Sequence, residues 1–534
     1  MCIDCVFYFS FKKKIDTLCL IYCNILIVIN QEVFQIYIKF MNKKILFVPL
    51  DERPCNWLFP QKLIQCIDGF ELLEPTKEML GNKKTPSNFA LLKDFIFQNI
   101  KEANAAVISI DQLLYGGIVP SRIHNLSLDE LKERLMIIKE IKKINPNIIL
   151  YCFVLIMRCP KYSSSDEEPD YYEIYGEKIN KIGSLIERGE DYSFLLNDEL
   201  KTSLEDYIER RKKNLCLIKE TINLLNGSID YLLIPQDDSQ TEGFTMMDRK
   251  EVLNLIQNSG FKNIDLYPGA DEIGLTLLSR AINNINNSSK KIYLDFLYEE
   301  SESLIPAYEN KPLLDTIKHH INASGNTLVG DIDDSDIVLF LNYDKNEEQE
   351  SSNPVDNLNE TDILSQIKRM KSAKNKGKTT SLVDKFYVNG GNLKYMEVLS
   401  NHMNIDDLDV YSGWNTSSNS LGTAISFSTT ISYQGKTIES TKFLAERIYD
   451  DLIYQALIRR KITSETLPSL NLNYFDIRDK QKEVESLTKD ALEEYAEKHF
   501  KAFYSKHQIK YLEMPWKRMF EIFLEVKSWK KWLY

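Results

Sequence analysis

From Met41 onward, hydrophobic and polar positions follow two alternating periods along the chain. Segments such as 127–144 and 248–257 have the apolar spacing of amphipathic helices. Between such segments lie short β-branched and apolar runs with the length of strands. This alternation is typical of βα units, so the predicted fold class is α/β with a mostly parallel sheet. The strand candidates are 45–50, 70–73, 105–110, 148–156, 231–234, 264–267, 292–297, 337–342, 382–388 and 408–411.

The same pattern does not determine whether the sheet closes into a barrel. The strand candidates outnumber those of a closed barrel, and a TIM-barrel-like fold, a doubly wound sheet and two stacked sheets all remain possible. Residues 41–440 are predicted to form an α/β catalytic region. Within it, the polar segment 347–378 is interpreted as an exposed helix between linkers, or as a lid. Strand signals stop beyond about residue 441, which predicts a mainly helical C-terminal cap over 441–534.

Residues 1–40 differ from the rest in being rich in Ile, Phe, Tyr and Cys. Met41 directly precedes the first convincing strand, which favours a misassigned translation start. A targeting segment or anchor is the competing interpretation, because the lysines at 12–14 precede the apolar run 18–29. That run is short for a membrane span, and no small-residue cleavage site follows it. A genuine structural segment is the third alternative.

Composition narrows the class of protein. The 534-residue chain is 43% hydrophobic, enough for a large core, and its net charge of -12 gives no basic footprint for nucleic acid. No other long apolar run occurs, so we expect no membrane contact beyond a possible N-terminal segment, and a cytoplasmic location. The cysteines, including Cys2, Cys5, Cys19 and Cys23, favour neither a disulfide framework nor a zinc site. The oligomeric state stays open.

Polar and charged side chains directly follow the predicted strands, where functional groups collect in parallel α/β proteins. Each alone has a structural interpretation as a helix cap or turn residue. Together they would crowd like charges along one edge of the sheet unless a ligand, a metal or mutual pairing neutralised them, so we predict a polar pocket. The candidates, in chain order, are Asp51, Arg53, Asn56, Asp111, Tyr115, Arg158, Asp237, Asp238, Asp271, Glu272, Trp414, Asn415 and Asn419.

Several of these residues belong to segments that resemble a known family. The segments are VPLDERPCN (48–56), SIDQLLYGG (109–117), PQDD (235–238), PGADEIGLTLLSR (268–280) and SGWNTSSNSLGTA (412–424). On this evidence the chain resembles the bacterial proteins grouped as domain of unknown function 4127, in order from Met41 to about residue 460. The resemblance implies no particular activity, so the chemistry has to be argued from the residues.

Adjacent carboxylates at the strand ends suggest proton transfer. In the pairs Asp237–Asp238 and Asp271–Glu272, like charges raise one pKa and leave a proton donor beside an ionised partner, which suits glycoside hydrolysis. The segment GADEIG is also similar to the catalytic Gly-Asp-Glu segment of family 20 hexosaminidases, and Asp237–Asp238 to the paired Asp of family 84 enzymes. This similarity implies Asp238 or Glu272 as the acid, and Asp237 or Asp271 as the carboxylate that orients a substrate acetamido group.

The remaining candidates are assigned to substrate binding. Asp51 and Arg53 would hold sugar hydroxyls by charge-assisted bonds, and Trp414 would pack against a pyranose ring. Asn415 and Asn419 would supply amide hydrogen bonds. The same binding role is assigned to Asn56, Asp111, Tyr115 and Arg158.

Two further classes of function use the same residues. A magnesium-dependent hydrolase would take Asp51, Asp111 and Asp237 as oxygen ligands. A non-catalytic sugar or metabolite-binding protein would use the same pocket, with 347–378 as its lid. The dispersed histidines argue against zinc, and no P-loop, dinucleotide-binding turn or serine elbow is present. We therefore expect a glycosidase-like hydrolase of a small-molecule or carbohydrate substrate that needs no cofactor.

Overall fold

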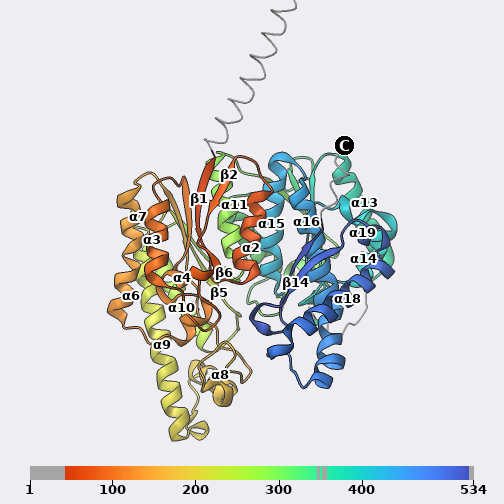
Figure 1. The fold of residues 1–534 in the computed structure, drawn as a ribbon. Helices are drawn as coiled ribbons and strands as arrows, with labels where there is room; N and C mark the ends of the chain where they lie inside the picture. The colour runs from red at the N-terminus through yellow and green to blue at the C-terminus, as the bar shows by residue number, and fades with distance from the viewer. Residues whose placement is uncertain (1–41, 346–348, 351–357, 528–534) are drawn as a thin grey trace, which may run out of the picture.

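Two α/β lobes and a C-terminal region make up the fold (Figure 1). The computed structural model describes residues 42–345, 349–350 and 358–527. Residues 43–285 form the N-terminal lobe, 291–434 the C-terminal lobe, and 438–526 the C-terminal region. The expectations for 1–40 fall on residues outside this description.

The N-terminal lobe is built on a six-stranded parallel sheet with the order β2-β1-β3-β4-β5-β6. Every residue of β3 (AAVIS) and of β5 is buried, because helices cover both faces of the sheet. The strands are β1 (Lys43–Val48), β2 (Phe70–Leu73), β3 (Ala105–Ser109), β4 (Ile149–Phe153), β5 (Tyr231–Gln236) and β6 (Ile264–Pro268).

Ten α-helices belong to this lobe, and several begin at recognisable caps. The side chains of Ser109, Ser127 and Asn197 each accept a hydrogen bond from a backbone N–H in the first turn that follows. The helices are α2 (Pro54–Gln65), α3 (Phe89–Asn99), α4 (Ile110–Tyr115), α5 (Ile118–Ile123), α6 (Leu128–Leu135), α7 (Ile137–Ile144), α8 (Tyr172–Arg188), α9 (Asp198–Asn223), α10 (Phe244–Ser259) and α11 (Ile273–Ile285).

The C-terminal lobe repeats this plan with a five-stranded parallel sheet in the order β13-β11-β9-β7-β8. Its strands are β7 (Lys291–Phe296), β8 (Thr327–Leu328), β9 (Ile337–Asn342), β11 (Thr379–Asp384) and β13 (Val410–Ser412), and a short parallel pair joins β10 (Gln349–Glu350) to β12 (Tyr387–Val388). The helices are α12 (Leu313–Ala323), α13 (Glu360–Asn375), α14 (Leu393–His402) and α15 (Ser417–Gln434).

The C-terminal region is mainly helical, but it also contains an antiparallel strand pair that the sequence pattern did not predict. Its helices are α16 (Ile438–Arg447), a π-helix (Ile448–Ile458), α17 (Arg459–Lys461), a short π-helix (Ile462–Thr466), α18 (Gln481–His499) and α19 (Lys501–Tyr504). The pair consists of β14 (Ile509–Glu513) and β15 (Phe523–Val526). These strands are short, and only Ile509, Leu512, Leu524 and Val526 are buried, which leaves a weak apolar signal.

The α/β fold class is confirmed, and the sheets adopt the doubly wound alternative. In each sheet the second strand in the chain lies outside the first, β2 beside β1 and β8 beside β7, so the winding direction reverses beside the first strand. Both sheets are open, and the TIM-barrel-like alternative is not adopted. Ligands of doubly wound folds bind at the carboxyl ends of the strands near this reversal.

The segment 347–378 contains a packed helix. Helix α13 buries Ile363, Ile367 and Met370 in an apolar cluster that also includes Val338 and Phe340 of β9. These contacts make α13 one of the covering helices of the C-terminal sheet, so the linker-or-lid interpretation does not hold for 360–375. Residues 351–357 lie outside the described part of the chain.

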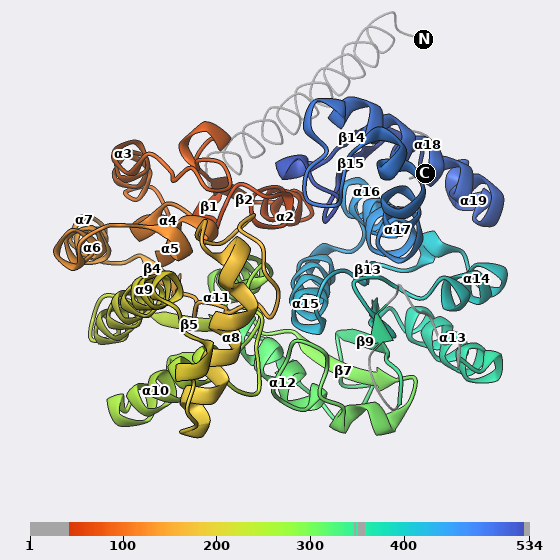
Figure 2. The ribbon, with the colours of Figure 1, turned by 90° about the horizontal axis from the view of Figure 1, so that it is seen from below.

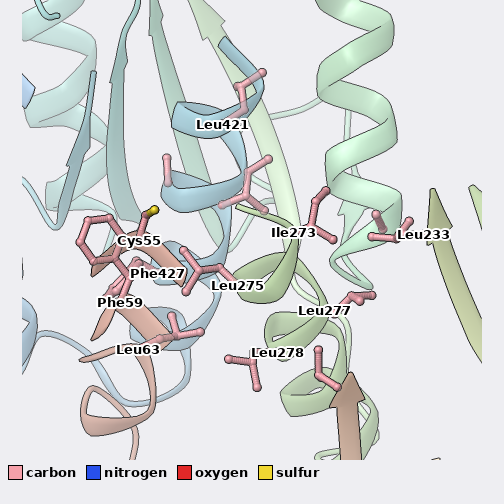
Figure 3. Packing of buried hydrophobic residues seen from close by; sticks show 14 of the residues in the cluster. Cys55, Phe59, Leu63, Leu233, Ile273, Leu275, Leu277, Leu278, Leu421 and Phe427 are labelled. Atoms are coloured by element: carbon pink, nitrogen blue, oxygen red, sulfur yellow. The ribbon is translucent and has the colours of Figure 1, made fainter. Parts of the chain in front are cut away.

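The two lobes share one apolar core. Helices α11 and α15 lie between the lobes (Figure 2), and one cluster of buried side chains continues from one lobe into the other. Figure 3 shows Phe59 of α2, Leu275 of α11 and Phe427 of α15 within this cluster. The shared core fixes the relative position of the two sheets, and with it the position of their carboxyl edges.

Gly422 permits the close approach of α15 to α11, which predicts a sensitive position. A Cβ at Gly422 would lie 2.2 Å from Cγ of the fully buried Glu272. We expect Gly422→Ala to lower the free energy of unfolding by about 1–3 kcal/mol, because overpacking outweighs the gain in helix propensity of about 1 kcal/mol. Urea unfolding measures this difference. Gly330→Ala is the control, since a Cβ there meets nothing within 4 Å; equal stability of the two variants would contradict the prediction.

Candidate active site

A cavity of about 280 Å³ lies between the lobes and the C-terminal region, on the side where the strands of the N-terminal sheet end. It combines four arginines, four carboxylates and five aromatic side chains. The N-terminal lobe contributes Arg53, Ile118, Arg122, Arg158, Tyr162, Glu167, Asp237, Asp238 and Asp271; the C-terminal lobe contributes Tyr308, Asn389, Asn415 and Thr416; and the C-terminal region contributes Tyr474, Phe475, Arg518 and Phe520.

Asp237 and Asp238 follow β5 and form an asymmetric pair of carboxylates. Asp237 is buried and accepts a 2.7 Å hydrogen bond from Nη2 of Arg122. Asp238 accepts a longer bond of 3.2 Å from Nη1 of Arg158, and its side chain remains 33% exposed. The walls of the cavity and the charge of Asp237 raise the pKa of Asp238 to about 6. One member of the pair is therefore poised to hold a proton near neutral pH while its neighbour is ion-paired.

Asp271 is tied to Arg53. The Arg53 guanidinium donates to Asp271 at 3.2 Å through Nη1 and to Asp51 at 2.9 Å through Nε. Asn56 Nδ2 bridges the same two carboxylates at 3.0 Å and 3.2 Å. Arg53 and Asp271 reach the cavity, whereas Asp51 and Asn56 lie behind them. Asp51 and Asn56 therefore act on a ligand only through the groups that they hold, which corrects their assignment to direct substrate binding.

Glu272 points away from the cavity, unlike its neighbour Asp271. It is fully buried between the lobes, where Oε2 accepts a 3.1 Å bond from the backbone N–H of Ala270 and Oε1 lies 3.3 Å from Nε2 of His320. Its side chain fills the space left by Gly422. The two residues stand at the start of α11, where successive side chains point about 100° apart. The Gly-Asp-Glu segment therefore places one carboxylate in the cavity and uses the other to join the lobes.

Two candidates from the third strand also lie outside the cavity. Asp111 is buried, and its Oδ2 accepts a 2.9 Å bond from the backbone N–H of Leu155; burial raises its pKa to about 7. Tyr115 is buried and stacks on His124 with ring centroids 4.7 Å apart. Their residue types suited a ligand, but α4 begins at Ile110 and turns both side chains into the protein.

Trp414 and Asn419 are buried, while Asn415 reaches the cavity. The Trp414 ring packs edge-on against Phe59 at 6.0 Å, and its indole N–H donates to Thr423 Oγ1 at 3.3 Å. Trp414 is therefore a core residue, which corrects its assignment as a sugar platform. Asn419 lies in the first turn of α15, covered on all sides. Asn415 escapes this packing because its backbone takes a left-handed conformation, with φ 50°.

Left-handed backbone conformations cluster at the cavity. Asp238, Tyr308, Asn389 and Asn415 have φ between 42° and 62°, and all four line it. The Asn415 carbonyl is held in place by Lys385 Nζ at 2.6 Å and by the backbone N–H of Asn389 at 3.2 Å. Such conformations persist in non-glycine residues only where the surroundings enforce them, and they concentrate at functional sites.

Three of the aromatic side chains that line the cavity are exposed, unlike the aromatic side chains of the core. Tyr162, Tyr308 and Phe475 are 46–49% exposed and line the cavity. Exposed rings beside planar polar groups are suited to packing against the apolar face of a sugar. These residues, together with Arg122, Glu167 and Arg518, were missing from the predicted site. Arg122 and the acidic run 166–168 were visible as polar residues near strand ends, but Tyr308, Phe475 and Arg518 carry no pattern that marks them.

The three carboxylates proposed as magnesium ligands each have a hydrogen-bond partner within the protein. In the part of the chain that the structure describes, no three or more His, Cys, Asp and Glu side chains are grouped to hold a metal ion. Asp51, Asp111 and Asp237, the proposed ligands, are held by Arg53, Leu155 and Arg122 respectively.

Across the described residues, no helix has the length and apolar character needed to cross a bilayer.

The fold and cavity together define a two-lobed α/β protein with a polar site between doubly wound lobes. The chain belongs to the family described as Protein of unknown function (DUF4127), whose model matches residues 45–525. A search of curated proteins found no match.

Similar solved structures include two of Rhizobium etli pyruvate carboxylase. For the T882A enzyme with acetyl coenzyme A, sequence identity is 11%, the TM-score is 0.17, and the match covers 74% of this chain and 25% of that chain. For the Y628A carboxyl transferase domain with pyruvate, sequence identity is 8% and the TM-score is 0.19, and the match covers 86% of this chain and 63% of that chain. The chain thus spans less than two thirds of either, and similarities this weak carry no argument about function.

Proposed function

We propose that this protein is a glycosidase-like hydrolase that cleaves a small sugar substrate by acid catalysis, with Asp238 as proton donor. The observation that carries the proposal is the asymmetric pair: Asp238, with its pKa raised to about 6, beside Asp237, which is paired with Arg122. Pairs of carboxyls whose environments separate their pKa values are typical of acid–base catalysis.

In the proposed reaction, Asp238 gives its proton to the glycosidic oxygen as the bond from that oxygen to the anomeric carbon breaks. Asp237, ion-paired with Arg122, either stabilises the positive charge that develops on the sugar or orients a substrate acetamido group for attack on the anomeric carbon. Water completes hydrolysis and restores the proton to Asp238. No cofactor takes part in this scheme.

The composition of the cavity supports a sugar as the substrate. Arg53, Arg158 and Asn415 present planar donors, and Asp271 presents an acceptor, so vicinal hydroxyls have complementary partners. Tyr162, Tyr308 and Phe475 supply exposed ring surface. We also propose a cytoplasmic location, as expected from the sequence, which directs the search toward small soluble glycosides.

A panel of nitrophenyl glycosides, including N-acetylhexosaminides, tests the proposal directly. We expect release of nitrophenol from at least one glycoside, undiminished by a chelator. Activity that disappears in chelator and returns with Mg²⁺ would instead identify the metal-dependent alternative. The proposal fails if the folded protein hydrolyses no glycoside of a broad panel.

A non-catalytic binding protein is the second candidate. The observation that favours it is the position of the cavity between two doubly wound lobes, since two-lobed binding proteins close around ligands at such positions. Calorimetric titration with free sugars separates the two candidates: tight binding of a sugar without turnover of any glycoside would establish the binding protein.

A further inference from the structure

The C-terminal region returns to the cavity through residues 514–521, which belong to the connection between β14 and β15. We call residues 514–521 the C-terminal strap. Arg518 in this strap is 3% exposed, and both Arg518 and Phe520 line the cavity. Trp516 anchors the strap, because its indole N–H donates to Glu52 Oε1 at 2.6 Å and its ring lies 5.1 Å from the Arg53 guanidinium.

Arg518 is held by side chains from its own strap and from the N-terminal lobe. Its guanidinium stacks on Trp516 at 4.5 Å, and Nη2 donates to Glu521 at 3.1 Å. Nη1 donates to Oε1 of Glu167, which lies in the loop between β4 and α8. A salt bridge between Arg518 and Glu167 thus joins the strap to the edge of the N-terminal sheet.

Glu167 also holds the two arginines that contact the acid pair. Its second oxygen, Oε2, accepts hydrogen bonds from Arg122 Nη1 at 3.0 Å and from Arg158 Nη2 at 3.1 Å. Arg122 in turn binds Asp237, and Arg158 binds Asp238. Burial alone would raise the pKa of Glu167, but the surrounding arginines, Arg518 first among them, hold it well below its usual range.

We infer that the C-terminal strap is part of the active site, with Arg518 and Glu167 as positioning residues that fix Arg122 and Arg158 against Asp237 and Asp238. This inference rests on the proposed function for its catalytic consequence. Its geometric basis is a continuous path of hydrogen-bonded side chains from the strap to both members of the acid pair. Glu167 has one oxygen for Arg518 and the other for the two inner arginines, so it must share its charge among three cations.

The Arg518–Glu167 salt bridge would respond to mutation differently if it only held the strap in place than if it positioned the charges around Asp238. If Arg518 only fastened the strap, loss of either partner of the salt bridge would loosen it in the same way. If the pair positions charge around Asp238, the two losses act in opposite directions. Neutralising Arg518 removes a positive charge, and Glu167 then pairs more strongly with Arg122 and Arg158. These arginines stabilise the ionised form of Asp238 less, so that form becomes less favourable. Neutralising Glu167 frees both arginines for the acid pair.

The effects of the neighbouring charged groups on the pKa of Asp238 have the signs that this argument requires. Asp237 on its own loop and Glu167 raise the pKa of Asp238, whereas Arg158 and Arg122 lower it. Tyr162, in the same loop as Arg158, also interacts with Asp238. Arg518 reaches this set through Glu167.

The test compares Arg518→Gln, Arg518→Lys and Glu167→Gln in the full-length chain, with Arg188→Gln as the control. Arg188 forms a surface ion pair with Glu190 and Glu242. The readout is the titration of the Asp238 carboxyl carbon by NMR, with the signal assigned from its absence in Asp238→Asn. We expect the midpoint to rise by roughly half a pH unit or more in Arg518→Gln and to fall by a similar amount in Glu167→Gln. Arg518→Lys should stay near the wild type.

The pH dependence of kcat/KM on a hydrolysed glycoside is the second readout, and its alkaline limb should move with the NMR midpoint. Midpoints that move in the same direction, or that match Arg188→Gln, would overturn the inference even if the enzyme hydrolyses glycosides. Opposite movements without any hydrolysis would uphold the positioning pair and reject the proposed function. If Arg518→Gln does not fold, the fall in Glu167→Gln and the unchanged Arg518→Lys still decide the question.

Discussion

Asp238→Asn is expected to reduce kcat/KM for glycoside hydrolysis by about 10²- to 10⁴-fold, the usual contribution of a positioned general acid. The asparagine amide keeps the size of the side chain, but its N–H protons are far too weakly acidic to be transferred to the leaving oxygen. Asparagine also tolerates the left-handed backbone at this position, where φ is 42°, so the loss cannot be assigned to local misfolding. Steady-state kinetics with the best substrate of the glycoside panel measures the effect.

Stability provides an independent check on the same variant. The pKa of Asp238 is raised in the folded state to about 6, so its stabilising contribution is present at low pH and is lost as pH rises through that value. Asp238→Asn does not suffer this loss, and we expect it to be as stable as the wild type in acid and more stable on the alkaline side. Asp333→Asn, at an exposed surface pair with Lys376, is the control. An active or a destabilised Asp238→Asn protein would contradict the assigned role.

Arg53→Met is expected to lower the free energy of unfolding by about 3–5 kcal/mol, because it leaves buried carboxylates without their cation. Arg53 is 5% exposed and is bonded to Asp51 and to Asp271, which are equally enclosed. Methionine fills much of the arginine volume, so the lost charge is the dominant change. Urea unfolding at neutral pH measures the difference, with Arg188→Met as the surface control.

The pH dependence of the Arg53→Met variant follows from the same charges. Without Arg53, the carboxylates of Asp51 and Asp271 are buried side by side with no guanidinium between them, and acid relieves the repulsion between their charges. The destabilisation should therefore be smaller in acid and larger at neutral pH. Asp271→Asn in the Arg53→Met background should recover part of the stability. A loss that is independent of pH and unaffected by Asp271→Asn would show that packing, and not charge, is the role of Arg53.

Local patterns in the sequence predicted several of the residues that the structure brings to one cavity. Arg53, Arg158, Asp237, Asp238, Asp271 and Asn415 all follow predicted strands, and all line the cavity. Their convergence has a simple basis, because the carboxyl ends of parallel strands meet along one edge of a sheet. The same reasoning misplaced Glu272 and Trp414, since it identifies the end of a strand but not the direction in which a side chain points once a helix begins.

Other parts of the site lay beyond any local pattern. Arg518 and Glu167 are 351 residues apart in the sequence, and no local pattern around either residue predicts their contact. Tyr308 and Phe475 are exposed aromatics in loops, which the sequence cannot distinguish from ordinary surface residues. The β14–β15 pair was missed for a related reason, because each of its strands buries only two residues.

The sequence by itself determined the α/β class, most of the strands and the acidic and basic character of the strand ends, because periodicity and turn chemistry act over a few residues. Only the tertiary structure decided that the sheets are two open, doubly wound ones, which candidates face the cavity, and that residues of the C-terminal region such as Arg518 and Phe520 also line it. Those outcomes depend on how helices α11 and α15 pack between the lobes. Packing of that kind is set by the shapes of side chains that are distant in sequence.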